Sequence, residues 1–146
     1  MVAGGRFRLA DTAQQVVGGF LLAGPFVVTE EVWVLAASMG WPHALVAAGI
    51  VAAIGYGALY QADSDRDPDR EQDLAGVPVR FLSLMGVSFG AVAVLALALT
   101  APTTFLVDGE ILSDPSRVTL VLTTLKAITV GAIFSVVGAA TADSVF

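Results

Sequence analysis

The sequence predicts an all-α polytopic membrane protein with four transmembrane helices and both termini in the cytoplasm. Of its 146 residues, 56% are hydrophobic and 14% are charged, whereas a soluble domain carries about 25% charged residues. The charges gather in short stretches, and the apolar runs between them reach about 18 residues or more, enough for a helix to cross a bilayer. We therefore expect a single transmembrane helical domain over residues 1–146, with a multi-pass location in the cell membrane and the lipid bilayer as its surroundings.

The expected spans cover about residues 12–39, 43–61, 80–107 and 118–142. Gly40 and Pro42 predict a tight turn between the first two spans, because glycine ends helices and proline starts them. Residues 62–79 are expected to form an acidic cytoplasmic loop, and residues 108–117 a short polar turn. Open strands are excluded because their unpaired backbone groups cannot cross lipid.

Prolines and small residues predict how the spans bend and pack. Pro25 removes a backbone hydrogen bond and is expected to kink the first helix near the membrane centre, while Pro102 is expected to bend or end the third. Glycine spacing predicts faces on which helices approach closely. These packing positions are Gly86 and Gly90 on the third span and Gly131 and Gly138 on the fourth.

The distribution of arginine predicts the topology. With four spans, both termini and the loop of residues 62–79 share one side of the membrane. That side carries Arg6, Arg8, Arg66, Arg70 and Arg80. The other side carries Arg117 alone, so the positive-inside rule places both termini in the cytoplasm.

Composition excludes several classes of function. The chain has no cysteine, so disulfides and thiolate metal sites are excluded. Its net charge of −6 argues against nucleic-acid binding and is typical of a halophile. Asp63, Asp65, Asp67 and Asp69 alternate as in a calcium loop, but Pro68 stands where that loop needs glycine, which favours a solvated linker. We expect no metal, no cofactor and no enzymatic activity.

Glu30, Glu31 and Lys126 are the charges that the pattern places inside the membrane. Counted from the predicted outer ends of their helices, all three lie about 14 Å below the outer surface. An unpaired charge in lipid costs at least ~2.5–3.5 kcal/mol. The sequence therefore predicts that Lys126 pairs with one of the two glutamates. The other glutamate is a candidate proton or cation site, because adjacent helix residues point about 100° apart.

Threonines accompany these charges. Thr29 precedes the glutamates, and Thr123 shares a face of the last span with Lys126. Such a stripe can line a water-filled path, but threonines also bond the carbonyls of their own helix. Pro25 frees a carbonyl next to the acids, and freed carbonyls can bind cations.

The stretch "GGFLLAGPFVVTEEVW", residues 18–33, resembles a family of integral membrane proteins catalogued as domain of unknown function 2391. The matching residues are Gly18, Gly19, Pro25, Thr29, Glu31, Val32 and Trp33, with Gly138, Ala139 and Ala142 near the C-terminus. The resemblance is strong over the first span and weak elsewhere. It implies membrane location and no particular activity, and it singles out Glu31 as the motif acid.

Two functions follow from this pattern. The first is a homo-oligomeric ion channel or transporter for a small ion. Glu30 or Glu31 would bind the cation or proton, Lys126 would supply the counter-charge, and Pro25 would shape the site. The alternative is a non-conducting membrane scaffold or accessory subunit, in which the Glu–Lys pair only locks helix packing. Neither reading involves nucleic acid.

Overall fold

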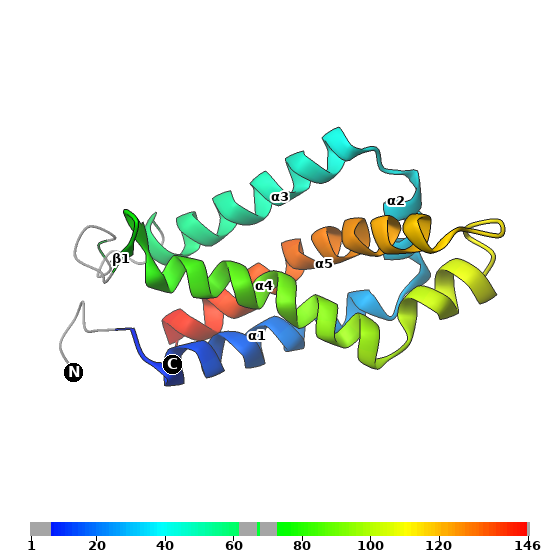
Figure 1. Ribbon diagram of the computed structural model, residues 1–146. Helices are drawn as coiled ribbons and strands as arrows, with labels where there is room; N and C mark the ends of the chain where they lie inside the picture. Colours follow the sequence, from blue (N-terminus) through cyan, green and yellow to red (C-terminus); the bar gives the residue numbers. More distant parts are fainter. Residues whose placement is uncertain (1–6, 62–66, 68–72, 146) are drawn as a thin grey trace.

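The computed structural model is mostly helical, and its long helices lie along a common axis (Figure 1). It describes residues 7–61, 67 and 73–145. The helices are α1 (Leu9–Val27), α2 (Glu30–Ser38), α3 (Trp41–Tyr56), α4 (Val79–Ala98) and α5 (Arg117–Val145), with the π-helical segments η1 (Gly57–Gln61) and η3 (Pro102–Asp108). Strands β1 (Asp73–Leu74) and β2 (Val77–Pro78) pair antiparallel just before α4.

Helices α1, α3, α4 and α5 run lengthwise, and α2 lies across them toward one end (Figure 1). Helices α1 and α4 run toward α2, and α3 and α5 run back. We call the end where α1 begins and α5 finishes the termini end, and the opposite end the α2 end. Within the described residues, three helices are long and apolar enough to span a membrane, and α1 with α2 makes a fourth if that bent pair is one span.

The first predicted span, residues 12–39, is broken rather than kinked. Helix α1 ends at Val27, α2 begins at Glu30, and the two differ in direction by 81°. Pro25 remains inside α1, so the break lies after the proline and not at it. The expectation of one continuous helix with a kink at Pro25 was therefore wrong.

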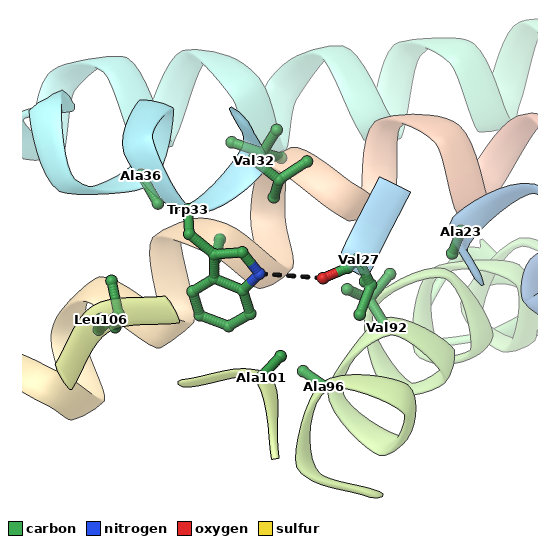
Figure 2. Packing of buried hydrophobic residues seen from close by; sticks show 11 residues of the cluster. Ala23, Val27, Val32, Trp33, Ala36, Val92, Ala96, Ala101 and Leu106 are labelled. Carbon is green, nitrogen blue, oxygen red and sulfur yellow. Dashed lines mark hydrogen bonds between the residues drawn. The ribbon is translucent and has the colours of Figure 1, made fainter. Parts of the chain in front are cut away.

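Side chains of the second helix hold this break in place. The Thr29 hydroxyl donates to the carbonyl of Phe26 at 2.7 Å. The indole Nε1 of the buried Trp33 donates to the carbonyl of Val27 at 3.0 Å (Figure 2). The last carbonyls of a helix have no partner within it. Here they gain partners from the residues after the break, so the corner costs few hydrogen bonds.

The third predicted span, residues 80–107, is also two elements. Helix α4 ends at Ala98, and Thr100 adopts a positive φ of 53° in the turn that follows. Pro102 then opens η3. The amide lost at proline and the left-handed turn before it account for the interruption.

Two apolar clusters fill the interior. At the α2 end, Trp33 packs against the ring of Phe105, with centroids 6.0 Å apart, and contacts the cluster of Val27, Val92 and Leu106 (Figure 2). The second cluster joins α3, η1, α4 and α5 toward the termini end. Its buried members include Val51, Leu59, Leu84 and Val136.

Glycines permit the closest helix contacts. A Cβ on Gly18 of α1 or on Gly138 of α5 would collide with the backbone oxygen of the other, and a Cβ on Gly131 would lie 2.7 Å from Val92. Gly86 and Gly90 differ from their prediction. A Cβ on either would meet nothing within 4 Å, so this GxxxG pair packs against no helix among the described residues.

Candidate functional site

Lys126 does not form the predicted ion pair with Glu30 or Glu31. Its Nζ donates to the carbonyl of Met39 at 2.8 Å and lies 5.0 Å from the ring centroid of Trp41. Met39 follows the last residue of α2, where helix carbonyls carry partial negative charge. The lysine therefore fastens the corner between α2 and α3 to α5.

Glu30 and Glu31 are exposed residues in the first turn of α2. Because α2 turns away from α1, its buried positions are Val32, Trp33 and Ala36, and the two acids point away from the bundle. The N-terminus of a helix favours negative charge. The break thus removes the acids from the interior position in which a continuous helix would have placed them.

Of the two predicted threonines, Thr29 hydrogen-bonds to nearby backbone and Thr123 lies buried on α5. The Thr29 hydroxyl donates to the carbonyl of Phe26 at the break between α1 and α2. Thr123 is buried on α5, and the neighbouring Thr124 and Thr129 donate to carbonyls four residues earlier, at 2.7 and 2.9 Å. The candidates Glu30, Glu31, Lys126, Thr29 and Thr123 therefore do not converge on one site. Lys126 contacts the C-terminal end of α2, whereas Glu30 lies exposed in its first turn.

Buried charge gathers instead at the termini end. The guanidinium of Arg80 on α4 donates to Oδ1 of Asp143 on α5 at 2.7 Å, and Asp11 on α1 lies 3.6 Å away. The side chain of Arg80 is 9% exposed and that of Asp143 is 0% exposed. The ring of Phe7 lies 5.1 Å from the guanidinium carbon. One arginine therefore joins three helices through charged contacts.

A neutral hydrogen-bond chain continues from these charges along α1. Ser83 Oγ donates to Oε1 of Gln15 at 2.7 Å and lies 3.0 Å from the hydroxyl of Thr12. Because Ser83 has one hydroxyl hydrogen, Thr12 is the donor of the second bond. Gln15 is fully buried. We call Asp11, Thr12, Gln15, Arg80, Ser83 and Asp143 the termini-end network.

The sequence interpretation missed this network. Arg80 served only as a loop charge in the topology argument, and Asp143 lies one residue beyond the predicted fourth span. The available signal was helical spacing. Asp11 and Gln15 are four residues apart, and Arg80 and Ser83 are three apart, so each pair shares a helix face. The two polar faces lie at the termini end of α1 and of α4, and these helices are neighbours in the structure.

Chemically, the network is suited to holding helices together. Charge-assisted hydrogen bonds are about twice as strong as neutral ones, and a buried arginine fork can serve two carboxylates. Among residues 7–61, 67 and 73–145, no three His, Cys, Asp or Glu side chains gather in a way that could hold a metal ion. Of the alternating aspartates in the acidic loop, Asp67 alone belongs to these residues.

Comparison of the chain with protein-family models, with curated proteins and with solved structures gives no match. The resemblance to the family catalogued as domain of unknown function 2391 therefore stays a prediction.

Proposed function

We propose that the protein is a four-span integral membrane module with a structural role, as a scaffold or accessory subunit, and with both termini in the cytoplasm. The observation that carries this proposal is the buried pair of Arg80 and Asp143, at 2.7 Å, which joins α4 to α5. In the sequence interpretation, a Glu–Lys pair locked the helices. The proposed lock uses different residues at the opposite end of the bundle.

Helix lengths support the membrane placement. At 1.5 Å per residue, α1 rises about 24 Å from Asp11 to Val27, and α5 rises about 26 Å from Lys126 to Asp143. Both lengths are close to the thickness of a hydrocarbon core, about 30 Å. The proposed bilayer therefore lies between the termini-end network and the α2 corner, and α1 crosses it without α2. Arg8 and Arg80 at the termini end favour the cytoplasm for that side.

The interior between the two ends supports a non-conducting role. Phe26 stacks on Phe134 with centroids 3.8 Å apart, and Val92 packs against Gly131. Apolar side chains in close contact exclude the water that a moving ion needs.

Ion flux in proteoliposomes tests the proposal. We expect vesicles containing the protein to pass protons, monovalent cations and halides no faster than protein-free vesicles, while gramicidin added to the same vesicles gives rapid cation flux. Flux that scales with protein content in the vesicles would refute the non-conducting role.

Ion transport by a homo-oligomer is the second candidate, and the broken first span favours it. Broken helices bind ions in many transporters, and Glu30 and Glu31 lie directly after the break. Because both acids are exposed on one chain, a second copy would have to enclose them. This proposal requires wild-type flux that is lost in Glu30→Gln or Glu31→Gln while the assembly stays intact.

A further inference from the structure

Strained backbone bounds the segment that carries η3. We call residues 100–114 the η3 strap. Thr100 and Asp114, at its two ends, adopt φ angles of 53° and 45°, and Glu110 within it adopts 59°. These are three of the four residues other than glycine that have positive φ in the described part of the chain. A residue with a Cβ is unfavourable in this left-handed region, and such strain persists only where the surrounding structure imposes it. Holding the strap in place therefore costs free energy at both of its ends.

Apolar side chains hold the η3 strap against the bundle. Leu106 is fully buried in the cluster that contains Trp33 (Figure 2), and the ring of Phe105 stacks on the indole of Trp33 with centroids 6.0 Å apart. Ile111 and Leu112 are partly buried against the same cluster. Among the described residues, the hydrogen bonds of the strap interior stay within the strap. The strap can therefore move away from Trp33 by breaking apolar contacts alone.

We propose that the η3 strap is a hinged cover over Trp33, with hinges at Thr100 and Asp114. When closed, the cover packs on the indole whose Nε1 donates to the carbonyl of Val27 at 3.0 Å, and so fixes the break between α1 and α2. When open, it relieves the strain at both hinges, exposes the indole and frees the break to change its angle. The cover does not depend on the proposed structural role, because it would act in the same way in a conducting protein. The flux experiment and the test of the cover therefore fail separately.

Exchange of the indole hydrogens with solvent deuterium tests the cover. The chain has two tryptophans, so NMR spectra of the protein in nanodiscs contain two indole signals. We expect the Nε1 hydrogen of Trp33 to exchange at least about tenfold faster than the slowest backbone amides of α5, because the cover opens without unfolding the bundle. Trp41 is exposed and serves as the freely exchanging reference. Equal rates for Trp33 and those amides would overturn the proposal, because the bond to Val27 would then open only when the whole fold does.

A matched pair of substitutions tests the hinge. Asp114→Gly removes the Cβ from an exposed residue with positive φ and should hold the cover shut. We expect it to slow exchange at Trp33 by about two- to fivefold. Asp108→Gly makes the same chemical change at an exposed residue of η3 whose φ is not positive, and it should leave that rate unchanged or raise it. If Asp114→Gly slows exchange no more than Asp108→Gly does, the indole is released by movement of α2 and the proposed cover is wrong.

Discussion

Arg80 is the residue on which we expect stability to depend most, because it is a buried cation that joins three helices. Arg80→Met leaves the buried carboxylate of Asp143 without the guanidinium that lies 2.7 Å away. Removing one member of a buried ion pair costs about 3–5 kcal/mol. We expect a loss of that size in the free energy of unfolding, measured by denaturant titration in mixed micelles.

The matched control for Arg80→Met is Arg117→Met, which changes an exposed arginine at the start of α5 and should cost less than about 0.5 kcal/mol. The double variant Arg80→Met with Asp143→Leu should recover part of the loss, because it no longer buries a carboxylate without the guanidinium. Equal costs for Arg80→Met and Arg117→Met would mean that the pair does not hold the helices together.

Lys126 distinguishes the observed contacts from the ion pair predicted by sequence. Lys126→Met removes a charged hydrogen bond to Met39 and the contact with Trp41, and we expect it to cost about 1–2 kcal/mol. Glu30→Gln and Glu31→Gln change exposed side chains and should each lie within about 0.5 kcal/mol of wild type. Thermal melting of the three variants makes the comparison. If either glutamate variant costs as much as Lys126→Met, the Glu–Lys pair exists after all.

At the scale of helices, α1 and α5 can cross closely because glycines, which have no side chain, stand at the point of contact. Gly18→Ala places a methyl group against the backbone of Gly138 and 2.7 Å from Ala142 Cβ, so the helices must separate and lose contacts. Gly90→Ala, inside α4, meets nothing within 4 Å. We expect Gly18→Ala to lower Tm and Gly90→Ala to raise stability by up to about 1 kcal/mol through helix propensity. Equal effects of the two variants would argue against the close crossing.

The helices were predictable because a long apolar run has few alternatives to a helix in lipid. The break after Val27 was not, although Pro25 pointed to a disturbance nearby. Its position depends on the bond from Trp33 to the Val27 carbonyl, and that bond forms only once α2 has turned away. The sequence pattern therefore predicted that the helix is disturbed near Pro25. Contacts that form in the folded chain determined the angle between α1 and α2.

The charged network was harder to predict than the helices because it depends on which spans are neighbours. Arg80 and Asp143 are 63 residues apart in the chain, and nothing local to either residue indicates the other. Pairing charges that lie at the same depth in the membrane was sound reasoning. It was applied to Glu30 and Lys126, however, on the assumption that α1 and α2 form one straight helix. Once the chain turns by 81°, counting residues from Gly40 no longer measures depth.

At the scale of the whole molecule, the proposed placement assigns Glu30 and Ser144 to opposite faces of the membrane. The chain contains no cysteine, so Glu30→Cys and Ser144→Cys each carry one thiol, both at exposed positions. We expect a membrane-impermeant maleimide to label Glu30→Cys in intact cells, because the proposed placement puts the break at the outer boundary. Ser144→Cys should be labelled only after permeabilisation, since the same placement puts the end of α5 on the cytoplasmic side. If Glu30→Cys resists the reagent from both sides, residue 30 lies within the hydrocarbon, where charge is costly, and the first span crosses the membrane as α1 and α2 together. If the two variants exchange sides, the bundle is placed correctly and its orientation is inverted.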